Sequence, residues 1–225
     1  MIPIQEIYDT YKVMPTLREH QLRVAAIGLY IAEHCHEDVD SVAVVSALLL
    51  HDMGNCIKFD FSIFPQFCEP EGVAYWERIQ HAYRLAYGHN EHHAHMLIAE
   101  ELGMEPHILE YIDAVGFSTM QDVALSDSLE KKICAYADQR VGPFGVISLA
   151  ERLEEGRKRY GISLKEARMD LVAAVFDIEA ELTRVTGEYI ADINESTIAS
   201  YKKRVAEMRL SVHISEPIFI KFLEK

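Results

Sequence analysis

The segment SVAVVSALLLHDMG, residues 41–54, constrains the fold of this chain more than any other. Its apolar side chains cover nearly every face of a helix rather than one stripe, and such a helix is stable only when neighbours surround it. Asp40 can cap its start and Gly54 can end it. We therefore predict a helix at the centre of a bundle, with His51 and Asp52 in its last turn.

Helical patterns extend over most of the remaining chain. Apolar residues recur mainly at helical rather than alternating spacing. Helix-start signals with an acidic residue three positions later are frequent, and they begin at Thr16, Asp127, Ser148 and Ser163. We predict an all-α helical bundle that forms one domain over residues 1–225, with its core at about 16–160 and a helical extension at about 161–225.

The segment between Asn55 and Pro70 lacks a clean period. It is rich in aromatic residues and contains two prolines, which favours an ordered loop over a helix. We expect this loop to form the wall of a pocket.

Composition and charge limit the partners of the chain. The 36 acidic and 22 basic residues give a formal charge of −14, which disfavours binding to long nucleic acid. Binding of a small phosphate ester remains compatible with this negative charge, because a metal and a few local cations can dominate the electric field of a pocket. Four irregularly spaced cysteines and the lack of a leader or spanning segment indicate a cytoplasmic protein that does not bind membranes.

Four residues have the chemistry and the placement of a metal site. His20 lies early in a predicted helix, His51 and Asp52 end another, and Asp138 interrupts the apolar face of a third. A hydrolytic divalent metal takes nitrogen and oxygen ligands and often draws them from separate elements. Because His51 and Asp52 are adjacent, they can reach one ion only at the end of a helix, where the backbone leaves the regular path.

Each of these residues alone also has an ordinary structural interpretation. His51 could cap helix carbonyls and Asp52 could be solvated, while Asp138 could pair with Arg140 or Lys132. The ordered set of four favours the metal site over these separate interpretations.

The motifs REHQLRVA, LLLHDMGN and YADQRV, followed by PFGVISLAERLEEGRKRYG, resemble in order and spacing the HD-domain superfamily of metal-dependent phosphohydrolases. The resemblance covers about residues 16–160. It implies an HD-type helical bundle in which His20, His51, Asp52 and Asp138 bind a divalent ion such as Mn, Fe, Co, Ni, Zn or Mg. It also implies hydrolysis of a phosphate ester of a nucleotide or similar small metabolite by metal-activated water.

The segment GHNEHHAHMLIAEELG carries further histidines. His89, His92 and His93 share one side of a helix, whereas His95 is expected to point elsewhere. Histidines in this region of the family bind a second metal or contact the phosphate. The resemblance therefore favours His92 as a catalytic residue beside Asp52, with His89 and His93 as alternatives.

The chain departs from the family pattern in two places. Two-metal relatives carry a histidine where the loop AVGFSTM has Gly116 and Phe117, which favours one metal ion per chain. Several relatives have a lysine where this chain has Asn55, and Lys58 could supply the missing cation. Arg140 is a second candidate for substrate binding, because it follows Asp138 by two residues.

Three functions therefore compete at this stage. The leading one is a phosphomonoesterase or phosphodiesterase acting on a small phosphorylated molecule, in particular a nucleotide. The second is a catalytically silent ligand-binding or scaffold protein with the same fold, and the third is an iron-dependent oxygenase. Homo-oligomerisation is left open by the sequence.

Overall fold

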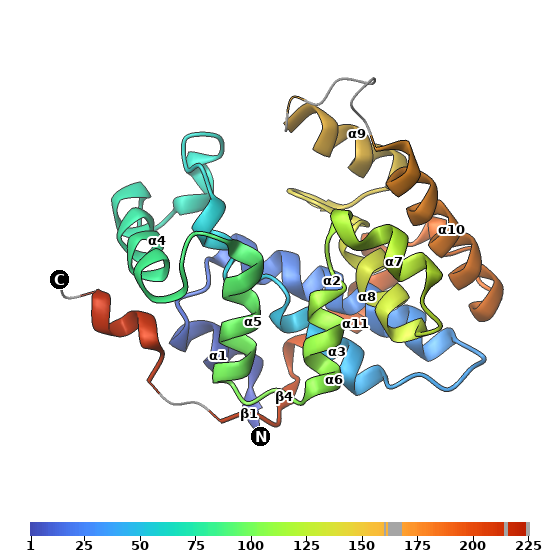
Figure 1. Ribbon diagram of the computed structural model, residues 1–225, viewed down its shortest axis with the longest axis horizontal. Coiled ribbons are helices and arrows are strands. Elements are labelled where there is room, and N and C mark those ends of the chain that lie inside the picture. The colour runs from blue at the N-terminus through green and yellow to red at the C-terminus, as the bar shows by residue number, and fades with distance from the viewer. Residues whose placement is uncertain (160, 162–167, 214–215, 224–225) are drawn as a thin grey trace.

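The computed structural model describes residues 1–159, 161, 168–213 and 216–223 and confirms the all-α prediction (Figure 1). The α-helices of this described part are α1 Ile4–Thr10, α2 Pro15–His34, α3 Ser41–Leu50, α4 Val73–Tyr87, α5 Glu91–Glu101, α6 Pro106–Asp113, α7 Met120–Leu125, α8 Leu129–Asp138, α9 Leu149–Arg159, α10 Met169–Thr186 and α11 Glu195–Ala206. Short 3-10 helices are η1 Asn55–Lys58, η2 Pro65–Cys68, η3 Phe117–Thr119, η4 Ile190–Asp192 and η5 Ile218–Phe222. The strands are two residues each: β1 Ile2–Pro3, β2 Val141–Gly142, β3 Gly145–Val146 and β4 Arg209–Leu210.

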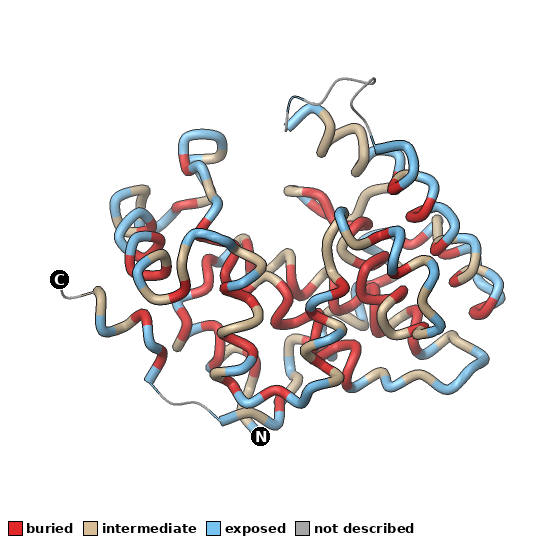
Figure 2. The backbone as a smooth tube through the Cα atoms, viewed as in Figure 1, coloured by how far each residue is buried: buried red, intermediate tan, exposed pale blue. Residues whose placement is uncertain are grey.

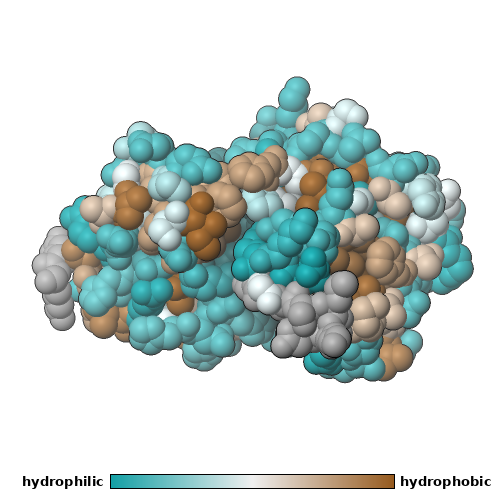
Figure 3. All heavy atoms as spheres, turned by 90° about the horizontal axis from the view of Figure 1, so that it is seen from above, coloured by the Kyte–Doolittle hydropathy of each residue, from teal (hydrophilic) through white to brown (hydrophobic). Residues whose placement is uncertain are grey.

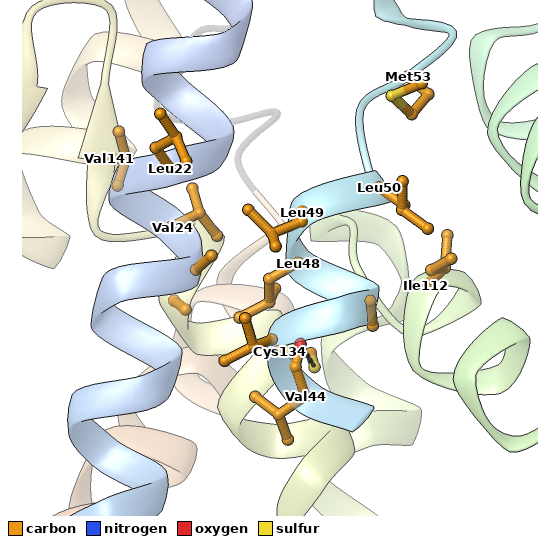
Figure 4. Packing of buried hydrophobic residues seen from close by; sticks show 14 of the residues in the cluster. Leu22, Val24, Val44, Leu48, Leu49, Leu50, Met53, Ile112, Cys134 and Val141 are labelled. Atoms are coloured by element: carbon orange, nitrogen blue, oxygen red, sulfur yellow. Dashed lines mark hydrogen bonds between the residues drawn. The ribbon is translucent and has the colours of Figure 1, made fainter. Parts of the chain in front are cut away.

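Helix α3 is the central element, as predicted from its apolar surface. Every residue from Ala43 to Leu50 is buried, and α2, α6 and α8 surround the helix (Figure 4). The Asp40 side chain caps its start by accepting a hydrogen bond from the Ala43 amide at 2.9 Å. Helices α2 and α3 approach closely at Gly28, where a Cβ atom would collide with the side chain of Leu48. This packing fixes the relative positions of the helices that carry the candidate ligands.

The predicted helix starts are correct in part. Ser148 and Glu151 form the expected reciprocal cap, with hydrogen bonds of 2.9 and 3.2 Å to each other's amides. Thr16 is not a cap, because Pro15 occupies the first helical position and moves the start of α2 upstream. Likewise, Ser128 rather than Asp127 caps α8.

The signal at Ser163 lies outside the described residues.

The described part of the C-terminal third is helical, as predicted, and packs on the rest of the chain. Helix α11 packs along α2, and α10 packs against α7 and α8. Strand β4 pairs antiparallel with β1 and so joins residues near both ends of the chain. Most buried positions lie where these helices meet, whereas Leu149 is the only buried residue of α9 (Figure 2).

Candidate metal centre

The four predicted ligands come together at the ends of packed helices. His20 lies in the second turn of α2, His51 directly follows α3, and Asp138 is the last residue of α8. Helix α3 ends at Leu50, so His51 and Asp52 belong to the turn that follows it rather than to a last regular turn. The backbone leaves the helix there, and both side chains can face the same point.

The distances between these side chains suit a shared ion. His20 Nε2 lies 3.2 Å from Asp138 Oδ1 and 3.4 Å from Asp52 Oδ2. His51 Nε2 lies 3.5 Å from Asp138 Oδ1 and 3.7 Å from Asp52 Oδ2. Ligand atoms about 2.0–2.2 Å from one ion are about 3–4 Å apart, which matches this spacing. His20, His51 and Asp52 each offer one ligand atom within 4.8 Å of the others, which defines a possible metal-binding group.

The hydrogen bond of the His51 ring prepares it to bind a cation. Its Nδ1 lies 2.7 Å from the carbonyl oxygen of Leu48, and a carbonyl can only accept, so Nδ1 carries the proton. In the neutral ring the lone pair is then on Nε2. This atom is buried and makes no hydrogen bond of good geometry within the described part of the chain. A buried lone pair beside two carboxylates is the arrangement that a metal ion would complete.

The electrostatics of the cluster also point to a cation. Burial alone would lower the pKa of His51, but Asp52 and Asp138 raise that pKa to about 9. Burial would raise the pKa of Asp138, yet its contacts with His20 and His51 hold that pKa well below its usual range. Burial would likewise raise the pKa of Asp52, but the nearby His51 and His20 lower that pKa below its ordinary value. Both carboxylates are therefore ionised and draw positive charge to their centre, either as protons on the rings or as a metal ion.

His95 faces this centre, contrary to the expectation that it would point elsewhere. Its Nε2 lies 3.8 Å from Asp52 Oδ1, and its Nδ1 accepts a hydrogen bond of 2.9 Å from the Gly54 amide. The close approach of α5 to the turn after α3 explains the difference, because a Cβ atom on Gly54 would come within 2.6 Å of the Ala94 Cβ. Sequence spacing alone did not reveal this approach.

His95 and His51 have opposite tautomers. Because Nδ1 of His95 accepts a hydrogen bond from the Gly54 amide, its neutral ring carries the hydrogen on Nε2. Burial lowers the pKa of His95 to about 3, so the ring is neutral around pH 7. His95 can therefore donate a hydrogen bond into the site but lacks a free lone pair for a metal ion.

The other predicted histidines lie farther out. His92 is half-exposed, and its Nε2 pairs with Asp113 Oδ1 at 2.8 Å. His89 and His93 are exposed and line neither of the two cavities described below. Of this cluster, the structure brings His95 rather than His92 to the carboxylate of Asp52.

The two predicted substrate-binding cations have different placements. Lys58 lies at the site, with its Nζ 3.4 Å from Glu91 Oε1. Arg140 does not: it is 1% exposed and donates to the carbonyl oxygens of Ile147, Ile190, Ala191 and Ile193. A guanidinium engaged in this way holds the C-terminal region in place and presents no donor to a substrate.

Two polar residues at the site, Asn55 and Arg152, were not chosen as site residues from the sequence. Asn55 donates from Nδ2 to Asp52 Oδ2 at 2.8 Å and so orients that carboxylate. Arg152 of α9 faces the site, and its buried Nε has no partner among the residues described. Its proximity follows from the path of the chain after α8, which no local pattern encodes.

Two cavities open onto the cluster. We call the first the aromatic cavity; it has a volume of about 450 Å³, and its wall includes Phe59, Phe61, Ile63, Phe64 and Phe67. The loop that follows Asn55 therefore forms the wall of a pocket, as predicted. We call the second the wide cavity; it has about 900 Å³ and includes Val115, Phe117, Leu153, Leu171, Val172 and Phe176.

Comparisons with protein-family models, with curated proteins and with solved structures gave no significant match. Among the described residues, no helix is long and apolar enough to span a bilayer.

Proposed function

We propose that this protein is a metal-dependent phosphohydrolase of the HD type, with His20, His51, Asp52 and Asp138 as the ligands of one divalent ion. The observation that carries the proposal is the buried, unpartnered Nε2 of His51 directed at the same point as two ionised carboxylates. The order of these residues along the chain matches the H…HD…D signature of that superfamily.

The donor set restricts the chemistry of this ion. Two imidazoles and two carboxylates are nitrogen and oxygen ligands, typical of hydrolytic divalent metals, and no cysteine belongs to the group. When bound, such an ion lowers the pKa of water towards neutrality and offsets negative charge on a phosphoryl group. Four protein ligands also leave coordination positions open in an octahedral geometry.

The surrounding residues then have separate tasks. Asn55 holds the carboxylate of Asp52 in place. His95 donates through Nε2–H to a phosphoryl oxygen, and its backbone contact with Gly54 keeps that hydrogen on the correct nitrogen. Arg152 and Lys58 line both cavities at the cluster and supply positive charge for an anionic substrate.

The single-ion proposal has two supports. Gly116 and Phe117 stand where two-metal relatives have a histidine, and both line the wide cavity. His95 is the buried histidine nearest to Asp52 outside the ligand set, and its Nδ1 is already engaged. His92 also lines the wide cavity, but its Nε2 pairs with Asp113 at 2.8 Å, so neither histidine offers a second ion the ring nitrogen that is already engaged.

The direct experiment is a screen of the protein after separate loading with Mn²⁺, Zn²⁺, Fe²⁺, Co²⁺, Ni²⁺ and Mg²⁺. Nucleotides, cyclic nucleotides and generic phosphate esters serve as substrates, with ester cleavage and phosphate release as the readouts. We expect metal-dependent turnover that Asp52→Ala abolishes. Stoichiometric metal without turnover on any ester would favour a binding or scaffold role, and two irons with redox activity would favour an oxygenase.

A further inference from the structure

The metal cluster lies where the two cavities meet, rather than at the bottom of one pocket. Asp52, Lys58, Asp138 and Arg152 line both the aromatic cavity and the wide cavity. A phosphate held by the cluster and by Arg152 would therefore have space on two sides. Both volumes lie in the range of about 300–1,000 Å³ that is typical of small-molecule sites.

Each cavity has a predominantly apolar wall beyond this junction. The aromatic cavity is bounded by the loop after η1, in which Phe64 and Phe67 stack with ring centroids 5.0 Å apart. Phe144 packs edge-on against Phe64 from outside the residues that line the cavity. Flat organic groups bind well to such surfaces, because aromatic rings offer large apolar faces.

The wide cavity is bounded by α10 and by the segment around η3. Val172 and Phe176 are four residues apart and present one face of α10 to this space. Seen from above, hydrophobic residues gather on both sides of the hydrophilic helix α9 (Figure 3). Helix α9 contributes to both cavities: Arg152 and Arg159 line the aromatic cavity, and Arg152, Leu153 and Arg157 line the wide cavity.

The cations of the wide cavity away from the junction already have acidic partners. Arg157 pairs with Glu154 at 2.8 Å, and Arg168 pairs with Asp170 at 2.6 Å. At the junction, Arg152 pairs with Glu155 at 2.9 Å but keeps a buried Nε without a partner among the described residues, whereas the cations farther out offer no such unpartnered buried donor to a chain of further phosphates. The wide cavity therefore favours an organic group over a polyphosphate tail.

We propose that the substrate is a phosphodiester, with one organic group in each cavity and its single phosphate at the cluster. This inference rests on the proposed phosphohydrolase function and narrows it. In the reaction, the oxygen of water forms a bond to phosphorus and the bond from phosphorus to one ester oxygen breaks. One proton of the water passes to the departing oxygen and the other stays on the product, which gives an alcohol and a phosphate monoester.

A pair of esters with the same leaving group tests this proposal in the metal-loaded, full-length protein. The diester is thymidine 5′-(4-nitrophenyl phosphate), and the monoester is 4-nitrophenyl phosphate; both report through release of 4-nitrophenol. We expect kcat/KM for the diester to exceed that for the monoester by about tenfold or more. A gain of this size is typical when an organic group of the substrate occupies an apolar pocket that fits it. An equal or higher value for the monoester would overturn the proposal.

A substitution that partly fills the wide cavity provides the second test. Val172→Trp places a larger side chain in the wide cavity, while Ala173→Trp makes the same change at an exposed neighbour that lines neither cavity. We expect Val172→Trp to lower kcat/KM for the diester about tenfold and to leave the monoester within about twofold. Ala173→Trp should match the parent on both esters.

The outcomes separate this proposal from the function on which it rests. If neither ester is cleaved by protein that holds its metal ion, the phosphohydrolase function fails and the diester proposal fails with it. If both esters are cleaved and Val172→Trp changes them equally or not at all, the function stands and the diester proposal is wrong. A thermal midpoint and a metal content equal to those of the parent exclude misfolding of the variant as the cause.

Discussion

Two buried polar clusters in this protein differ in whether the protein itself satisfies their hydrogen-bonding groups. Around Arg140, the guanidinium meets the hydroxyl of Tyr136 and several backbone carbonyls, so its charge is satisfied by the protein itself. Around His51, a buried ring nitrogen without a hydrogen-bond partner lies beside two ionised carboxylates. The first arrangement stabilises a fold, and the second is suited to a ligand.

The unpartnered atoms support this distinction. Within the described part of the chain, buried side-chain nitrogen or oxygen atoms without a hydrogen-bond partner belong to Gln21, His51, Asn55 and Arg152. His51, Asn55 and Arg152 lie at the candidate site, and Gln21 follows His20 in α2. Buried polar groups are almost always paired, so this concentration supports our proposal that a ligand binds there.

The largest effect should follow from removing a metal ligand. We expect His51→Ala to lose stoichiometric metal and to lower turnover of a phosphate ester by about a thousandfold or more, because the loss of a ligand empties the site. Elemental analysis, turnover and far-UV circular dichroism measure the metal, the activity and the helix content. His107→Ala, at a half-exposed histidine away from the cluster, should match the parent in all three. Full metal content in His51→Ala would contradict our assignment of the cluster.

Arg140→Met tests the other cluster. The substitution leaves buried carbonyls without donors, so we expect the free energy of unfolding to fall by about 3–5 kcal/mol. Metal content per folded chain should stay at the parent value. Arg152→Met is the matched comparison, in which we expect little change in stability but weaker activity. If Arg140→Met instead lowered activity without affecting denaturant unfolding, the division into a structural and a ligand-binding cluster would be wrong.

His95→Ala distinguishes a hydrogen-bond donor from a metal ligand inside the candidate site. Removing one preorganised donor should lower turnover by about 100- to 1,000-fold, while metal content should stay unchanged. His92→Ala should have a much smaller effect, because its ring is half-exposed and pairs with Asp113. Loss of metal from His95→Ala would make His95 a ligand and contradict the tautomer assigned from Gly54.

The smallest expected effect is the pH dependence of stability in the metal-free protein. The carboxylates raise the pKa of His51 from 6.5 to about 9, so the folded state holds a proton that the unfolded state releases. This stabilisation is fully present below pH 6.5 and is lost as the pH rises through about 9. Thermal midpoints at a series of pH values should fall across this window, and His51→Gln should flatten the decline. A parent midpoint that rises over the same window would contradict the assignment.

Much of the fold could be predicted from local patterns. The apolar surface of residues 41–50 predicted the central helix, and Asp40 predicted its cap. The start of α2 was predicted less accurately, because Pro15 and Thr16 carry competing signals and proline occupies the first helical position. Local chemistry sets helix identity well and helix boundaries less well.

The candidate site was predictable only where its residues have distinctive types in a distinctive order. His20, His51, Asp52 and Asp138 meet, as their order along the chain suggested. The placements expected for His95 and Arg140 were wrong, because both side chains are positioned by tertiary contacts, His95 with Gly54 and Arg140 with the carbonyls of η4. Helical spacing shows which residues share a face, but it does not show which face meets the site.

The most direct test of this account is the metal stoichiometry of the parent and of Asp52→Ala. Each protein is stripped with a chelator, incubated with excess Mn²⁺ or Zn²⁺, freed of unbound ions and measured by elemental analysis. We predict one ion per chain in the parent and none tightly held in Asp52→Ala, as expected for one site with four protein ligands. Equal metal in the two proteins, or none in the parent with every ion tested, would contradict the central claim that this cluster is a metal centre.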